Sequence, residues 1–333
     1  MSGRITLDLD ALVADGRLTP AEAERLRGLA MPGRAVSTVI QVLYVFGALG
    51  LAAGVMVLKP DPVSGMVLAA AALGFASWTQ VSRNESLSIL GYAMAIAGTA
   101  GLSGSLALQF GDLLPPIAVN ALVTAITLAS ALWFRSAFLA AFVPLGIAAM
   151  VGSGTQYWHA AYGIFVKEPT ITVLLFGAMA LGLFAAANRL KGDRERQATV
   201  AGRVAWMVMN FGFWVGSLWG DHVGEHFMRA VKDGTVDWDA VEAWRANAVF
   251  IADYVFVIAW AAASLATIAL LRTNRFALNS AITFLAINGY TQFFERFGNS
   301  AVALLTGGAT LLAFAFGLYH FDRWAMARRK ASA

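Results

Sequence analysis

From Pro169 to Ala187 the sequence reads PTITVLLFGAMALGLFAAA, without a charged side chain. A helix crosses the hydrocarbon core of a bilayer with about 20 mainly apolar residues, so this segment has the length and composition of one membrane span. The whole chain is similar, because 59% of its 333 residues are hydrophobic and 13% are Asp, Glu, Lys or Arg. A soluble protein carries about 25% charged residues. The composition therefore excludes a soluble globule and predicts a polytopic membrane protein.

Apolar runs of similar length lie on both sides of this segment. The predicted spans are residues 36–58, 63–81, 86–108, 113–134, 137–157, 169–187, 204–219, 248–271, 277–293 and 300–319. We therefore predict an all-α transmembrane bundle of about ten helices within residues 36–320. A short helical hairpin (1–35) precedes it, an acidic outside loop (220–247) interrupts it, and a basic tail (321–333) follows it.

The distribution of Lys and Arg predicts the orientation, because cytoplasmic loops retain positive charge during insertion. With the N-terminus inside, 18 of the 24 Lys and Arg fall in cytoplasmic segments and 6 fall outside. Five of the 18 lie between Arg189 and Arg203, in a loop that is also suited to contact anionic lipid. We expect both ends in the cytoplasm, the lipid bilayer as the main partner, and no nucleic-acid binding.

The N-terminal hairpin has a clear helix start. Thr19-Pro20-Ala21-Glu22 is a capping box with Pro at the first helical position. A first helix should precede Asp15-Gly16-Arg17, and a second should begin at Pro20. The hairpin either rests on the membrane or on a neighbour, or it is a regulatory element or a docking site for a protein partner.

The outside loop contains the pentapeptide His222-Val223-Gly224-Glu225-His226. On a helix, His222 and His226 would face the same way and could share a metal such as zinc, with Glu225 as a ligand or base. The order of residues matches the inverted zinc-protease motif. Three interpretations are open: a solvated loop, a structural or sensing metal site, or a hydrolytic site. Gly224 disfavours the helix, and Asp221, Asp253 and Glu295 are the nearest further ligands by topology.

A second candidate site lies within the last spans. Asp253 follows the predicted start of the eighth span, and Asn288, Gln292 and Glu295 share one face of the ninth. Polar residues at membrane depth are costly, so we take these four as a possible outward-facing polar pocket. The alternative is that they form hydrogen bonds between helices or contact water at the interface.

Both ends of the chain show a resemblance to a known family. The segment Tyr290-Thr291-Gln292-Phe293-Phe294-Glu295-Arg296-Phe297-Gly298 is followed by Ser300, by Gly307-Gly308 and by a basic tail. Near the other end lie Leu9, Leu12, Val13, Gly16, Leu18 and Thr19. This layout resembles the prokaryotic membrane proteins grouped as domain of unknown function 2157. The resemblance implies a bacterial inner-membrane protein and brings no catalytic residue with it.

Three functional classes fit the sequence. A small-solute transporter would use the polar residues of the last spans, a sensor or scaffold would use the hairpin and the acidic loop, and a hydrolase would need a metal at the pentapeptide. The chain has no cysteine, which excludes disulfides, thiolate catalysis and Cys-ligated metals. We favour a non-enzymatic membrane protein with a transport or envelope-associated role, of undetermined oligomeric state.

Overall fold

The computed structural model describes residues 9–29, 47, 61–82, 87–158, 161–228, 231–232, 235–270, 274–298 and 300–331. The chain divides into two compact units, Met1–Ser105 and Leu106–Ala333. The predicted first span, residues 36–58, lies outside the described residues except for Gly47.

The first unit contains α1 (Leu9–Ala14), α2 (Pro20–Leu29), α4 (Pro62–Val81) and the start of α5 (Ser88–Phe110). The predicted capping box is confirmed, because the Thr19 N–H donates to Glu22 at 2.9 Å and the Glu22 N–H donates to Thr19 Oγ1 at 3.3 Å. Within this unit α4 and α5 approach closely at Gly98, where an added Cβ would lie 2.8 Å from the Leu73 side chain. A small residue is therefore required there.

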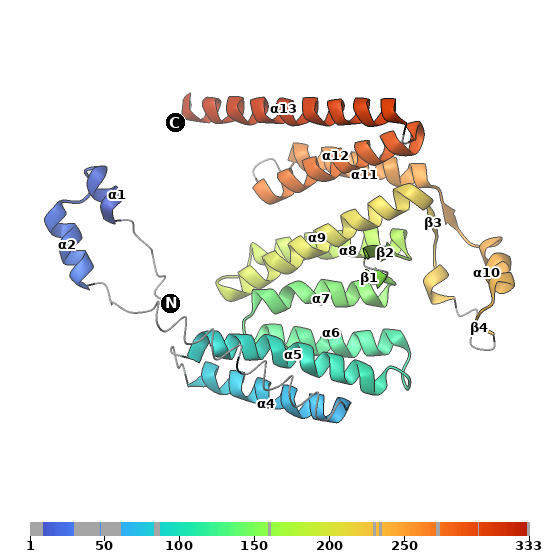
Figure 1. The fold of residues 1–333 in the computed structure, drawn as a ribbon, viewed down its shortest axis with the longest axis horizontal. Coiled ribbons are helices and arrows are strands. Elements are labelled where there is room, and N and C mark those ends of the chain that lie inside the picture. Colours follow the sequence, from blue (N-terminus) through green and yellow to red (C-terminus); the bar gives the residue numbers. More distant parts are fainter. Residues whose placement is uncertain are drawn as a thin grey trace. The chain divides into compact units, whose positions relative to one another are not determined.

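The second unit is built mainly from helices that alternate in direction (Figure 1). They are α6 (Pro116–Trp133), α7 (Ala137–Met150), α8 (Pro169–Ala187), α9 (Asp193–Trp219), α11 (Asp253–Leu270), α12 (Arg275–Phe297) and α13 (Ala301–Ala331). Helix α9 packs against α7, α8 and α11. The core at these contacts includes Phe176, Ala205 and Trp260, which are at most 1% exposed.

The structure is mostly helical but contains strands that an all-α fold does not include. Strand β1 (Ser153–Trp158) pairs antiparallel with β2 (Ala161–Val166). The predicted fifth span, 137–157, is therefore wrong at its C-terminal end, because α7 stops at Met150. Gly152 has φ +73°, a left-handed conformation that ends the helix and that glycine adopts without strain.

Smaller elements form a cap at the end of the second unit where α9 ends. They are β3 (Asp221–His222), the 3-10 helix η2 (Glu225–Phe227), β4 (Val231–Lys232), β5 (Thr235–Val236), α10 (Trp238–Arg245) and β6 (Phe250–Ile251). Strand β3 pairs with β6, and β4 pairs with β5. These segments and the β1–β2 hairpin lie at the right of Figure 1. We call the whole set, the hairpin included, the cap.

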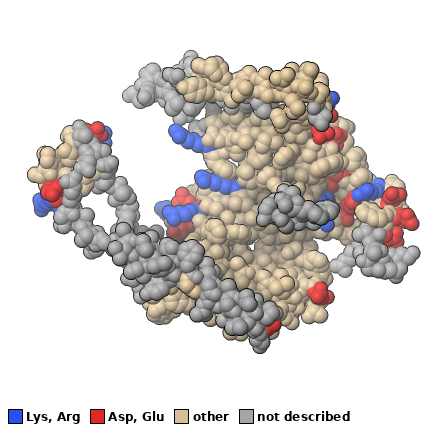
Figure 2. Space-filling model, in the orientation of Figure 1, with Lys and Arg blue, Asp and Glu red and all other residues tan. Residues whose placement is uncertain are grey.

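Five described helices are long and apolar enough to cross a membrane: α4, α5, α6, α8 and α11. Helix α9 is longer, but its first turns are charged. In the second unit, the turns at the end opposite the cap carry Arg135, the basic residues between Arg189 and Arg196, and Arg275. Figure 2 shows Lys and Arg projecting from that edge, whereas acidic side chains are more numerous on the cap side.

Candidate functional site

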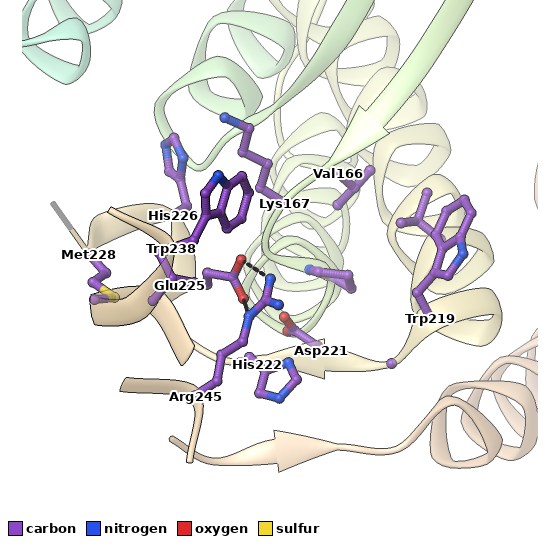
Figure 3. Close-up of a pocket in the computed structure, with 14 residues that line it drawn as sticks. Val166, Lys167, Trp219, Asp221, His222, Glu225, His226, Met228, Trp238 and Arg245 are labelled. Carbon is purple, nitrogen blue, oxygen red and sulfur yellow. Dashed lines mark hydrogen bonds and ion pairs between the residues drawn. The ribbon is translucent and has the colours of Figure 1, made fainter. Parts of the chain in front are cut away.

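The cap contains an open cavity of about 560 Å³. Its walls come from the start of α8, the last turn of α9, the segment after α9, and α10 (Figure 3). The lining residues are Val166, Lys167, Pro169, Val215, Trp219, Gly220, Asp221, His222, Glu225, His226, Met228, Trp238, Val241 and Arg245. The cavity therefore combines apolar, aromatic and charged side chains at one end of the bundle.

Two buried carboxylates hold the cap on the bundle. Glu168 precedes α8 but does not cap that helix; it accepts the backbone N–H groups of Gly224 at 2.8 Å and His226 at 2.6 Å. Asp221 accepts the N–H of Thr170, in the first turn of α8, at 2.8 Å. The first N–H groups of a helix have no partner within it, so Asp221 supplies the bond that Glu168 does not. The start of α8 and the segment after α9 thus each supply a carboxylate that accepts backbone N–H groups of the other.

Burial dominates the electrostatics of this pair. Glu168 is 0% exposed and Asp221 is 4% exposed. Loss of hydration raises the pKa of Glu168, although the Gly224 and His226 amides favour its charged form. Burial likewise raises the pKa of Asp221, against the effect of its bonds to Thr170. For both carboxyl groups the effect of burial exceeds the effect of the hydrogen bonds, so burial favours their neutral forms.

His226 closes the cavity on the side of α7. Its ring lies over Gly152, where an added Cβ would be 2.8 Å from the ring, and it bonds to the backbone of Met150. Burial and the nearby charge of Lys167 lower the pKa of His226. The ring is consequently a neutral part of the wall near pH 7.

Glu225 and Arg245 form a two-pronged ion pair across the mouth of the cavity. Arg245 Nε donates to Glu225 Oε2 at 2.9 Å, and Nη2 donates to Oε1 at 2.6 Å (Figure 3). The pair lowers the pKa of Glu225 and raises the pKa of Arg245. It joins η2 to the last turn of α10.

The pentapeptide predicted as a metal site is not helical along its length. His222 is in β3, where its ring lies 4.6 Å from that of Phe250, whereas Gly224 has φ +98° and His226 lies in η2. The i, i+4 helical geometry behind the zinc hypothesis is therefore absent. In the part of the chain that the structure describes, no group of three or more His, Asp or Glu is arranged to hold a metal ion.

The four residues predicted as a polar pocket separate into two kinds. The amide of Asn288 donates to the Val257 carbonyl at 3.2 Å, and that of Gln292 donates to the Ser217 carbonyl at 3.3 Å. These bonds join α12 to α11 and α9. Asp253 and Glu295 are exposed instead. Two of the predicted residues thus form interhelical hydrogen bonds.

Sequence reasoning missed Glu168, Lys167 and Arg245 as site residues. Glu168 is a single acid next to a proline, and nothing in the local pattern indicates that its partners lie more than 50 residues away. The available signal was the Glu168-Pro169 step itself, an acid directly before a helix-starting proline.

Comparison of the chain with protein-family models, curated proteins and solved structures finds no match. The resemblance to domain of unknown function 2157 stays a prediction.

Proposed function

We propose that the chain is a bacterial inner-membrane protein of about ten spans, with both ends in the cytoplasm, whose cap binds a small organic anion on the opposite side. The helices that are long and apolar enough to cross a membrane support the first part. The basic turns at the end away from the cap support the orientation, because positive loops stay in the cytoplasm. The role of the protein is then recognition of a solute at the outer face of the membrane.

The position of Lys167 in the cavity carries the proposal. Arg245 is paired with Glu225, and the Asp221 carboxyl, whose pKa is raised by burial, accepts the Thr170 N–H. Lys167 also lines the cavity and, within the described residues, forms no ion pair. A ligand with an acidic group would give this ammonium a partner.

The remaining wall suits an apolar body attached to that acidic group. Trp219 and Trp238 are 72% and 64% exposed, and Val215 and Val241 complete the apolar surface. Small-molecule sites are concave, mostly apolar, and about 300 to 1,000 Å³ in volume, with a few polar groups that fix orientation. The cap cavity has these properties.

Three matched probes test the ligand class: benzoate, benzamide and benzylamine, which share a ring and differ in charge. Saturation-transfer NMR on protein in nanodiscs should show contact with benzoate, which weakens strongly in Lys167→Gln and returns in Lys167→Arg. Lys191→Gln, at the opposite end of the bundle, is the control. Equal signals from all three probes, or binding of benzoate unaffected by Lys167→Gln, would refute the proposal.

Transport is the second candidate, and Asn288 favours it. Its side chain is 4% exposed, and Asn288 Oδ1 has no hydrogen-bond partner in the described part of the chain. A buried polar atom of this kind, between helices that end at the cap, is suited to contact a passing solute or water. If the protein transports the anion, Asn288→Leu should abolish benzoate uptake into proteoliposomes while binding at the cap persists. Uptake equal to that of wild type would remove this candidate.

A further inference from the structure

A second cavity, of about 400 Å³, lies between α6, α7, α8 and α9, toward the end of the bundle away from the cap. Its walls are mainly apolar and include Leu128, Leu132, Val143, Ile147, Met179 and Leu183. The polar side chains that reach it, Arg194 and Gln197, come from the start of α9. The cavity therefore has a mainly apolar wall and polar side chains from the start of α9.

Helix α7 contributes Pro144 and Ala140 to the wall. Proline has no N–H, so the helical hydrogen bond from residue 144 to the Ala140 carbonyl cannot form, and the ring crowds that carbonyl. An interior proline disturbs the local path of a helix in this way. The cavity thus lies beside the one stretch of α7 that cannot form a regular ladder.

Of the two polar side chains, only Arg194 is available to a ligand through its donors. The amide nitrogen of Gln197 donates to the Ala131 carbonyl at 2.6 Å, and Gln197 is 6% exposed. Arg194 is exposed and, among the described residues, makes no ion pair. A guanidinium at the mouth of an apolar cavity matches a phosphate attached to an acyl chain.

The charge around the mouth favours an anion further. Arg189, Lys191 and Arg196 lie in the same turn or in the first turn of α9, against the acids Asp193 and Glu195. Arg135 lies in the turn between α6 and α7, at the same end of the bundle. Basic pockets between membrane helices bind anionic lipid headgroups. We propose that this cavity holds one acyl chain of an anionic phospholipid, with the lipid phosphate bound by Arg194.

Native mass spectrometry of protein released from nanodiscs tests this site. The nanodiscs contain equal amounts of phosphatidylglycerol and phosphatidylcholine with identical chains. A basic residue near a membrane surface changes anionic-lipid binding by roughly fivefold. Wild type should therefore retain phosphatidylglycerol over phosphatidylcholine by at least that factor, and Arg194→Gln should lower the preference about fivefold. Arg296→Gln, an exposed arginine at the other end of the bundle, should retain it.

A second variant tests the acyl part of the site. Leu132 lines the cavity and is 54% exposed, so Leu132→Trp fills space without disturbing the buried core. It should lower retention of both lipids. Equal retention of the two lipids by wild type, unchanged retention in Leu132→Trp, or displacement of the lipid by excess inorganic phosphate would each overturn the proposal. The last outcome would indicate a site for free anions.

Discussion

The buried carboxylate of Glu168 accepts the backbone N–H of His226 at 2.6 Å, across 58 positions of the sequence. A second bond, from the Thr170 N–H to Asp221, runs in the opposite sense between the same two segments. The start of α8 and the segment after α9 are therefore joined by two carboxylates that satisfy each other's backbone donors. These hydrogen bonds fix the two segments that form walls of the cap cavity.

Removing Glu168 should loosen the cap. Glu168→Ala leaves the N–H groups of Gly224 and His226 without acceptors, and each buried unsatisfied donor costs about 1 to 3 kcal/mol. Hydrogen exchange of these two amides should accelerate at least tenfold, since about 1.4 kcal/mol corresponds to that factor. Exchange in α12 should not change. Glu195→Ala, on the exposed first turn of α9, is the control, and wild-type exchange in Glu168→Ala would show that the carboxylate does not hold the cap.

Acid should weaken the contribution of His226. The pKa of His226 is lowered in the folded protein from an ordinary value of 6.5. The contribution of His226 to the free energy of unfolding is therefore present above pH 6.5 and is lost as the pH falls through the folded pKa.

The pKa values of Glu168 and Asp221 are raised, so the pH dependence of these two groups has the opposite sign. Their contribution to the free energy of unfolding is complete in acid and is lost as the pH rises through their folded pKa values.

A comparison of His226→Gln with wild type isolates the histidine. The thermal midpoint of wild type should fall relative to that of the variant as the pH decreases below 6.5. Parallel curves for the two proteins across this range would show that His226 titrates as it does in the unfolded chain.

The ion pair of Glu225 and Arg245 should contribute little to stability. The two side chains are 33% and 40% exposed, and exposed pairs contribute about 0 to 1 kcal/mol because water and salt screen them. A double-mutant cycle with Glu225→Gln and Arg245→Gln should give a coupling energy in this range that decreases with added salt. Coupling well above it, insensitive to salt, would mean that the pair is shielded from solvent.

Gly216 permits α9 and α11 to approach. A Cβ at this position would lie 2.5 Å from the Phe256 ring, which is itself buried. Overpacking of this kind costs about 1 to 3 kcal/mol, so Gly216→Ala should lower the thermal midpoint in detergent. Gly182→Ala, on α8 with no heavy atom within 4 Å of the added Cβ, should have little effect. Equal midpoints for the two variants would contradict this close packing.

Helix positions could be predicted from the sequence where length and composition were decisive. Helix α8 has the predicted bounds, Pro169 and Ala187. Its apolar sequence contains no charged residue, a proline marks its first turn, and Asn188 follows its last. The predicted fifth span failed at Gly152, because the helix ends there and the next segment, Ser153–Trp158, is largely polar apart from its two aromatic residues and forms a strand.

The site was harder to predict than the helices because its contacts are distant in sequence. The pentapeptide was noticed for its histidines, but its structural role lies in the backbone N–H groups of Gly224 and His226, which bond to Glu168. Asn288 and Gln292 were predicted to share one face of a helix, and their hydrogen-bond partners are backbone carbonyls of α11 and α9. Side-chain spacing cannot reveal a partner that is a carbonyl of another helix.

Cysteine accessibility at the cap cavity tests the central claim most directly, since the chain has no native cysteine. Met228→Cys lines the cavity, and Lys191→Cys marks the opposite end of the bundle. In intact cells a membrane-impermeant maleimide should label Met228→Cys, benzoate should slow that reaction while benzylamine does not, and Lys191→Cys should react only after lysis. Labelling of Lys191→Cys but not Met228→Cys from outside, or a rate at Met228→Cys that benzoate leaves unchanged, would contradict an outward-facing cavity for an organic anion.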